Sequence, residues 1–181
     1  MTLRPFRWTC LALCLIGGCW QTARGELLVG AATADITPKL PVALDGQFYL
    51  RIAKTIETPL EANVIAIESR RDGQPPDLAV MVSCDLVYIT KEVLDKVREK
   101  VRREVPDLIT SKIFLNATHT HTAPVTVRDK YPIPKEGVTQ VGEYCEFLAE
   151  RVAGAIAKAW KSRATGSVTW GLGHAVIAYN R

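Results

Sequence analysis

Two of the three histidines in the chain, His119 and His121, lie in residues 112–124, KIFLNATHTHTAP. They follow an apolar run, residues 113–115, that is typical of a buried strand, and the polar residues after it indicate where that strand emerges at a sheet edge. Because side chains alternate faces in extended backbone, we expect both imidazoles to point the same way. Two imidazoles at the mouth of an α/β sheet could bind a metal, or they could hold the acyl group or oxyanion of a substrate.

An H-x-H pattern alone is weak evidence, because two half-exposed histidines among threonines are common. Here the apolar run before the pair, the threonines around it and Pro124 after it together indicate a strand-to-loop edge. Proteins of the α/β class place their chemistry at such edges. The context therefore favours a functional role for the pair.

Residues 1–25 are predicted to be a signal peptide. Arg4 and Arg7 form a positive n-region, and residues 8–18 form an apolar h-region too short to span a bilayer as a mature helix. The sequence Ala-Arg-Gly at 23–25 fits a small-x-small cleavage site, so we expect the mature chain, residues 26–181, to be exported.

A second cleavage is conceivable, because residues 16–19, IGGC, resemble a bacterial lipobox in which Cys19 would become a lipidated N-terminus. A good cleavage site also follows Cys19, which favours the soluble form. The predicted localisation is therefore secreted or periplasmic, with a lipoprotein anchored through Cys19 as the alternative.

The charge of the chain argues against a nucleic-acid partner. Its formal net charge is +4, but three arginines and no acidic residue lie in residues 1–25, so +1 remains for the mature chain. No basic stripe interleaved with aromatic residues is left to bind nucleic acid. With 181 residues, the chain is long enough for one domain with a substantial core.

Two cysteines, Cys84 and Cys145, remain after the predicted signal peptide. Export would permit a disulfide between them. However, Cys84 ends an apolar strand and Cys145 lies in a helical stretch, which favours two separately buried thiols. Without a C-x-x-C pattern, no cysteine zinc site is predicted.

The mature chain alternates predicted strands and helices, which indicates an α/β fold with a mixed sheet covered by helices. Residues 78–89 are nearly continuous in apolar side chains, as expected of a strand covered on both faces. Thr90 is expected to cap a helix, because an acidic residue and an apolar stripe follow it. The other predicted elements are strands at 27–36 and 60–68, a long loop at 39–58, an irregular segment at 125–137, a helix at 138–161 and a β-rich tail at 164–179.

Five blocks of the sequence, in order, resemble one family of enzymes. The blocks are VGAATADITP (29–38), TPLEANVIAIE (58–68), VSCDL (82–86), NATHTHTAP (116–124) and YNR (179–181). They are similar to segments of the neutral/alkaline non-lysosomal ceramidases, and the Thr-His-Thr-His block is quite specific. The resemblance covers the whole mature chain and implies that residues 26–181 are the N-terminal part of a ceramidase-like catalytic domain.

The resemblance implies a zinc-dependent amidase, secreted or membrane-associated, that hydrolyses the N-acyl bond of ceramide. By the same resemblance His119 is a zinc ligand, His121 lines the substrate site and Arg181 lies in the active site. The expected cofactor is therefore zinc. The expected substrate is a ceramide-like N-acyl lipid or another acyl amide, with contact to a membrane surface as a further possibility.

The family's remaining zinc ligands, a histidine, a glutamate and a tyrosine, all follow the segment at which this chain ends. One histidine, or even a chelating pair, is too few for a zinc site, which takes three or four protein ligands. The fold is therefore expected to be an incomplete N-terminal portion of a larger catalytic domain. The alternative is an exported, non-catalytic α/β module for binding, or a vestigial one.

Three further residues are weaker candidates. His174 could be a ligand, but a lone histidine beside glycines is more often a surface or turn residue. Asp35 is expected to cap a turn with Thr37. Asp85 could be either a turn former or the hydrogen-bond partner of a histidine.

Overall fold

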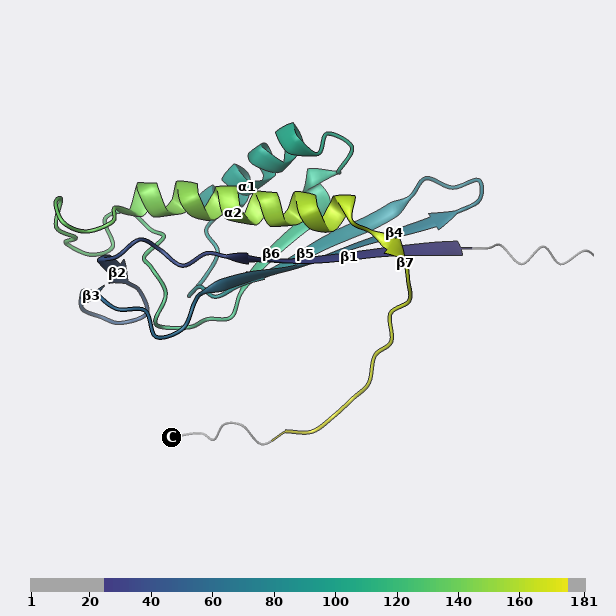
Figure 1. Cartoon of the computed structure of the whole chain (residues 1–181). Helices are drawn as coiled ribbons and strands as arrows, with labels where there is room; N and C mark the ends of the chain where they lie inside the picture. The colour runs from purple at the N-terminus through teal and green to yellow at the C-terminus, as the bar shows by residue number, and fades with distance from the viewer. Residues whose placement is uncertain (1–24, 176–181) are drawn as a thin grey trace, which may run out of the picture.

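A computed structural model of the chain describes residues 25–175. Within them, a five-stranded sheet carries two helices on one face, and a small two-stranded sheet lies at one end (Figure 1). The predicted α/β class, with a mixed sheet and helices against it, is confirmed.

The large sheet has the strand order β6-β5-β4-β1-β7. Its strands are β1 (Gly25–Asp35), β4 (Glu61–Arg71), β5 (Asp77–Cys84), β6 (Ile113–Ala117) and β7 (Ala164–Thr165). Strand β1 pairs antiparallel with both β4 and β7, and β4 pairs antiparallel with β5, whereas β6 pairs parallel with β5. A parallel neighbour requires a crossover connection, and the chain makes it through α1 (Lys91–Glu104) and the short 3₁₀ helix η1 (Thr110–Lys112).

The predicted cap at Thr90 is confirmed, since its Oγ1 accepts a hydrogen bond from the backbone N–H of Val93 at 3.2 Å. Helix α1 then buries one stripe, Val93, Val97 and Val101. The second helix, α2 (Val141–Lys161), begins three residues later than predicted.

The core lies between the helices and one face of the sheet. Alternate residues of β4 and β5 point into it, as their period-2 pattern requires. The principal buried side chains are Ala62, Val64, Ala66, Val80, Val82, Cys84, Val97, Tyr144, Leu148 and Ile156. Gly30 of β1 allows the closest approach of sheet and helix, because a Cβ atom there would lie 2.0 Å from the carbonyl oxygen of Ala159 in α2.

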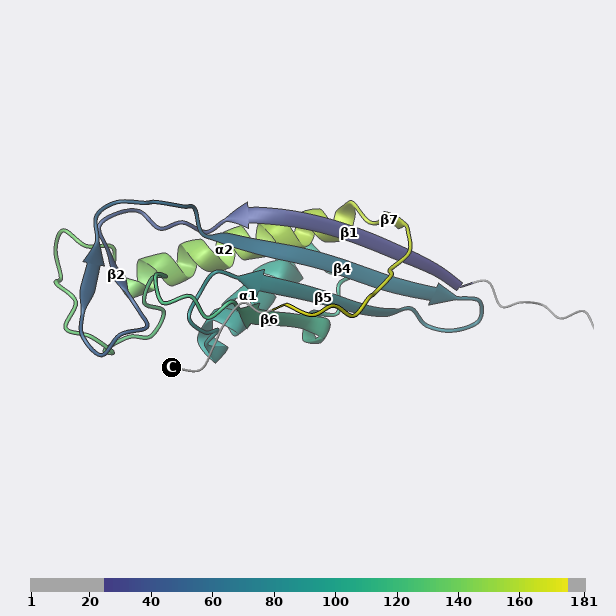
Figure 2. The same cartoon turned by 90° about the horizontal axis from the view of Figure 1, so that it is seen from below.

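The opposite face of the sheet is open, which corrects the prediction for residues 78–89. Strand β5 ends at Cys84 and buries only alternate side chains, while Met81 stays 45% exposed. The helices cover one face only, as the two views in Figures 1 and 2 show, so the apolar run does not mean burial on both faces.

Two other predictions need correction. The predicted loop at 39–58 contains a hairpin, β2 (Val42–Leu44) paired with β3 (Arg51–Ala53), which isolated bridges tie to Pro124 and Thr139. The described part of the predicted β-rich tail, residues 164–175, contains only β7, and residues 166–175 have no regular structure, while the predicted residues 176–179 lie outside the described residues. These segments depend on partners distant in sequence, which local patterns do not reveal.

The prediction of two separate thiols is confirmed: Cys84 and Cys145 are both buried and unpaired. Burial raises the pKa of the Cys84 thiol to about 12 and also raises the pKa of Cys145. Among residues 25–175, no helix combines the length and apolar character needed to cross a membrane.

Candidate active site

The histidine pair follows the end of β6. That strand ends at Ala117, and Thr118 fixes the exit by donating its backbone N–H to the Cys84 carbonyl at 3.0 Å. His119 then adopts a φ of 65°, in the left-handed region, so the backbone through the pair is not extended. The prediction that extended backbone puts both imidazoles on the same face is therefore wrong.

The two imidazoles nevertheless meet, and both side chains are exposed. Their rings pack edge to face with centroids 4.9 Å apart, and the two Nε2 atoms are 3.3 Å apart. Tertiary structure therefore produces the juxtaposition that the H-x-H spacing suggested. One ring nitrogen from each histidine converges on the same point.

A contact with the backbone of Val87 fixes the orientation of the His119 ring. Its Nδ1 lies 2.7 Å from the carbonyl oxygen of Val87. A carbonyl oxygen can only accept, so Nδ1 carries the hydrogen, and the neutral ring has its free lone pair on Nε2. The contact therefore aims the basic nitrogen of His119 at His121.

The loop of the β2–β3 hairpin holds His121. The Arg51 guanidinium donates to the backbone carbonyl oxygens of both Asp45, at 2.9 Å, and His121. Gly46 packs directly on His121 with a φ of +90°, and a Cβ at Gly46 would lie 2.5 Å from the imidazole Cγ. The hairpin is thus part of the site's framework.

Asp45 anchors that loop through its side chain, which is only 1% exposed. Its carboxylate accepts hydrogen bonds from the Gly46 N–H at 2.6 Å, Tyr88 Oη at 2.9 Å, Lys130 Nζ at 2.5 Å and Tyr131 Oη at 3.2 Å. Burial opposes ionisation of this carboxyl. The hydrogen bonds from Lys130, Gly46 and Tyr88 outweigh that cost and lower its pKa.

Sequence reasoning missed this cluster of Asp45, Tyr88, Lys130 and Tyr131. Its members come from segments that were predicted as a loop at 39–58, as part of a strand at 78–89 and as irregular chain at 125–137. The only local signal was the Asp45–Gly46 dipeptide, which is typical of a turn. Nothing in that dipeptide points to a lysine 85 residues away.

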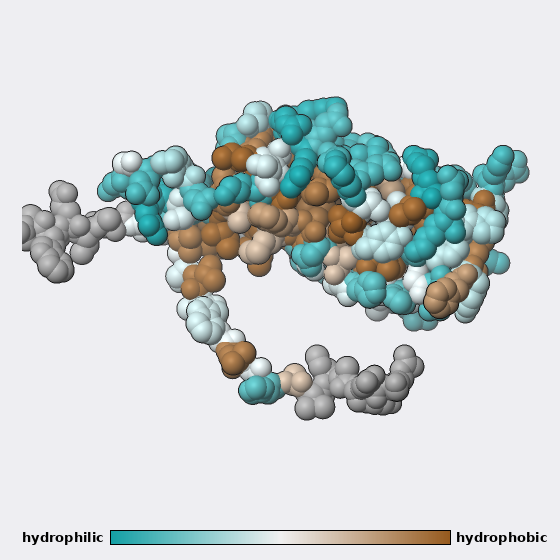
Figure 3. Space-filling view, turned by 180° about the vertical axis from the view of Figure 1, so that it is seen from behind, coloured by the Kyte–Doolittle hydropathy of each residue, from teal (hydrophilic) through white to brown (hydrophobic). Residues whose placement is uncertain are grey.

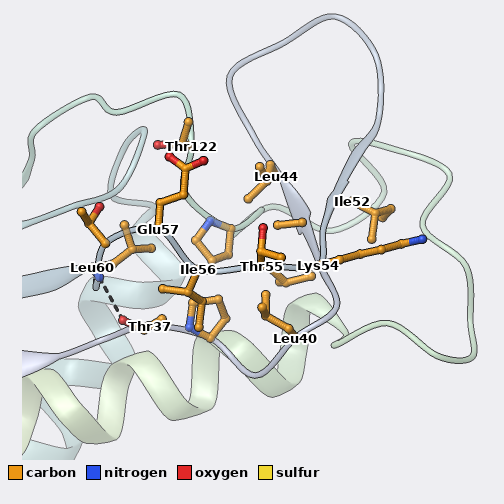
Figure 4. A pocket seen from close by; sticks show the side chains of 15 residues that line it. Thr37, Leu40, Leu44, Ile52, Lys54, Thr55, Ile56, Glu57, Leu60 and Thr122 are labelled. Carbon is orange, nitrogen blue, oxygen red and sulfur yellow. Dashed lines mark hydrogen bonds between the residues drawn. The ribbon is translucent and has the colours of Figure 1, made fainter.

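A pocket of about 370 Å³ lies next to the pair, between the hairpin and the residues that follow β1. Leu40, Leu44, Ile52 and Leu60 line it, and Figure 4 shows Glu57 pointing toward Thr122 at its rim. Thr122 directly follows His121 in the chain. A partly apolar cavity therefore lies beside the histidine pair, and Thr122 links the two.

Comparison with known proteins identifies the fold. No protein-family model and no curated protein sequence matches the chain. Among solved structures, the neutral ceramidase from Pseudomonas aeruginosa matches with a TM-score of 0.66 and 22% identity, over 79% of this chain and 23% of that one. A structure described as ceramidase complexed with C2 matches with a TM-score of 0.64 and 21% identity, over 79% of this chain and 22% of that one.

The fold is ceramidase-like. The chain spans about a quarter of the length of the neutral ceramidase that it matches, so the likeness is to part of that protein. At this level of identity the comparison confirms the fold that the five sequence blocks predicted.

Within this ceramidase-like fold, the remaining candidates separate clearly. The turn at Asp35 is confirmed, since its carboxylate accepts the Thr37 N–H at 2.8 Å. Asp85 accepts from Glu61 N–H and Thr118 Oγ1, so it secures the strand ends and makes no hydrogen bond to a histidine. His174 is exposed in the tail.

Two further predictions concern Arg181 and the metal site. Arg181 lies outside the described residues. Within residues 25–175, no group of three or more His, Cys, Asp or Glu side chains is arranged to hold a metal. The ceramidase-like fold therefore brings His119 and His121 together and does not add His174 to them.

Proposed function

We propose that this chain carries part of the active site of a zinc-dependent amidase that hydrolyses the N-acyl bond of ceramide or a related acyl amide. The observation that carries the proposal is the fixed orientation of His119. Its Nδ1 is engaged by the Val87 carbonyl, and its Nε2 lies 3.3 Å from Nε2 of His121. Metal-binding histidines commonly donate their other nitrogen to such a carbonyl.

The free Nε2 of His119 is an imidazole nitrogen of the kind that zinc binds at about 2.0–2.1 Å. In this proposal His119 holds the ion through Nε2. A zinc site takes three or four protein ligands. The proposal therefore assigns the further ligands to polypeptide outside residues 25–175.

The chemistry follows from these roles. When bound, zinc would supply a water of lowered pKa and would polarise the amide carbonyl. His121 faces the same point, so its Nε2–H can donate to the carbonyl oxygen as negative charge develops there. Arg181 is proposed to hold the oxyanion or the substrate's hydroxyl groups.

The substrate class is supported by the neighbouring pocket. Its lining combines leucine and isoleucine side chains with Lys54, Glu57 and several threonines, which suits a substrate that has both an acyl chain and polar groups. Thr122, which also lines it, adjoins His121 in the chain. Both matching structures are described as ceramidases. An N-acyl lipid combines the amide and the apolar chain that this arrangement would accommodate.

Export is the second part of the proposal. Residues 1–25 have the composition of a signal peptide, and an exported enzyme could meet lipid substrates at a membrane surface. The intact mass of the exported product tests this directly. A chain beginning near Glu26 is expected, and a lipid-modified Cys19 would replace the soluble form with the anchored one.

The metal and the reaction are tested together in the full-length protein. We expect His119→Ala to lose bound zinc and hydrolysis of an N-acylsphingosine. We expect His121→Ala to keep most of the zinc and lose turnover, while His174→Ala, in the exposed tail, should change neither. Zinc content is read by elemental analysis and turnover by fatty acid release.

The outcomes separate the two roles. Unchanged zinc content in His119→Ala would show that the ligand assignment is wrong. Normal hydrolysis by His121→Ala would remove that residue from the reaction. If the wild-type protein binds zinc but hydrolyses no acyl amide, the metal site is supported and the amidase activity is rejected.

A further inference from the structure

An apolar stripe crosses the open face of the large sheet. Ile65 of β4 pairs with Met81 of β5, and Met81 pairs with Phe114 of β6. These side chains are 46%, 45% and 55% exposed, so three adjacent strands present one continuous row. We call these three residues the sheet stripe. Figure 3 shows apolar surface over the strands on the side that faces the tail.

The tail that follows β7 carries a matching pattern. Val168, Trp170 and Leu172 are 59%, 91% and 88% exposed, and they alternate with threonine and glycine. In extended backbone this spacing puts all three on one face. The described tail, residues 166–175, thus contains an apolar face that is largely exposed.

The tail starts at a defined place. The Gly166 N–H donates to the Leu27 carbonyl at 2.9 Å, and Gly166 contacts the side chain of Val29. Residue 166 is therefore held at the β1 edge of the sheet. From there the chain turns to the open side and passes below β1, β4 and β5, as Figures 1 and 2 show.

We propose that residues 167–173 dock across the open face as an extended segment, with Val168, Trp170 and Leu172 covering the sheet stripe. Residue 166 lies level with Leu27 of β1, whereas the sheet stripe lies level with Ala31, four residues further along the strand. With strand spacings of about 4.8 Å and a rise of about 3.4 Å per residue, Ile65, Met81 and Phe114 lie roughly 17, 20 and 24 Å from residue 166. Seven extended residues, 167–173, span about 23 Å, which reaches Ile65 and Met81 and brings the end of the segment to the side chain of Phe114. The tail would form the first element of a second layer on the uncovered face.

We assign the open face to the chain's own tail, because the tail is covalently joined to the edge of the sheet. A segment joined to the sheet edge by one or two residues has an effective concentration in the millimolar range. A second copy, or a separate partner, would have to reach that concentration to compete. The proposal is independent of the amidase function, since none of its residues belongs to the histidine site.

Thiol cross-linking tests the position of the tail. Cys10, Cys14 and Cys19 are replaced by serine in the full chain, and the buried Cys84 and Cys145 are kept. A short bis-maleimide is added to dilute protein carrying Trp170→Cys and Met81→Cys. We expect an intramolecular link, located by peptide mass spectrometry.

Two matched pairs control for general mobility. Thr169→Cys replaces Trp170→Cys in the first, because residue 169 faces away in an extended segment and should link less. Glu99→Cys replaces Met81→Cys in the second, because Glu99 is exposed on α1, across the sheet. Equal yields from all pairs would overturn the proposal, as would links formed only between two molecules.

Methionine oxidation provides a measurement without cysteines. Docking should reduce the exposed fraction of Met81 from 45% to below about a tenth, so oxidation by peroxide should slow about fivefold. The triple variant Val168→Ser, Trp170→Ser and Leu172→Ser should restore the fast rate. The same rate in both proteins would mean that the tail does not cover Met81, and would reject the proposal.

Discussion

Gly46 and His121 are in direct contact, and the contact leaves no room for a side chain at position 46. A Cβ there would lie 2.5 Å from Cγ, 2.6 Å from Cβ and 2.8 Å from Cα of His121. The φ of Gly46 is +90°, which L side chains rarely adopt. The hairpin loop therefore fixes the second imidazole of the pair from outside the histidine segment.

Replacing Gly46 by alanine is expected to displace His121. The added Cβ must push the imidazole away, and strain and overpacking together should cost about 2–4 kcal/mol in the free energy of unfolding. Urea denaturation measures that loss, and the His121 ring resonances in NMR report the displacement.

Gly73→Ala is the matched control. Gly73 also has a positive φ, of +72°, but a Cβ there would meet nothing within 4 Å. It should cost only about 1 kcal/mol of left-handed strain and leave the His121 resonances unchanged. If both variants shift the His121 signals equally, Gly46 does not position the imidazole.

The Asp45 carboxylate should make the free energy of unfolding depend on pH. Its pKa is lowered in the folded state, so its contribution is present above the ordinary value and is lost as the pH falls through the folded value. Asp45→Asn removes the negative charge that faces Lys130 Nζ and should cost about 2–3 kcal/mol at neutral pH.

Denaturation curves between neutral pH and pH 2 test this dependence. Below about pH 4 the wild-type protein should lose stability more steeply than Asp45→Asn, which lacks the titrating group. Asp72→Asn, at an exposed turn, should follow the wild-type curve. Parallel curves for wild type and Asp45→Asn would contradict the assignment.

The contact between β1 and α2 should be sensitive to one methyl group. Gly30→Ala would put a Cβ 2.0 Å from the Ala159 carbonyl oxygen, so sheet and helix must separate. We expect a loss of about 2–3 kcal/mol by urea denaturation. Gly154→Ala, where a Cβ meets nothing within 4 Å, should instead stabilise the helix by about 0.5–1 kcal/mol.

The two buried thiols should resist alkylation. Burial raises the pKa of Cys84 to about 12 and also raises that of Cys145, so at pH 8 both thiols are less ionised than a free cysteine, and both are shielded from the reagent. Iodoacetamide should label neither residue in the folded protein and both in urea, as peptide mapping would show. Rapid labelling of either cysteine under native conditions would mean that the core opens at that point.

The sequence by itself determined the features whose partners lie a few residues away. The Thr90 cap needs only Val93, and the Asp35 turn needs only Thr37, so both could be predicted. The same holds for the alternating burial of β4, which follows from the period of a strand. The H-x-H segment was correctly singled out as the end of a strand.

Tertiary structure decided how the pair is built. The Val87 carbonyl that orients His119 is 32 residues away, and Lys130 is 85 residues from Asp45. It also decided that the helices cover one face of the sheet, so that an apolar strand such as β5 keeps Met81 exposed. Such contacts join residues that are far apart in the sequence and depend on how the whole chain folds. Local sequence patterns contain no information about them.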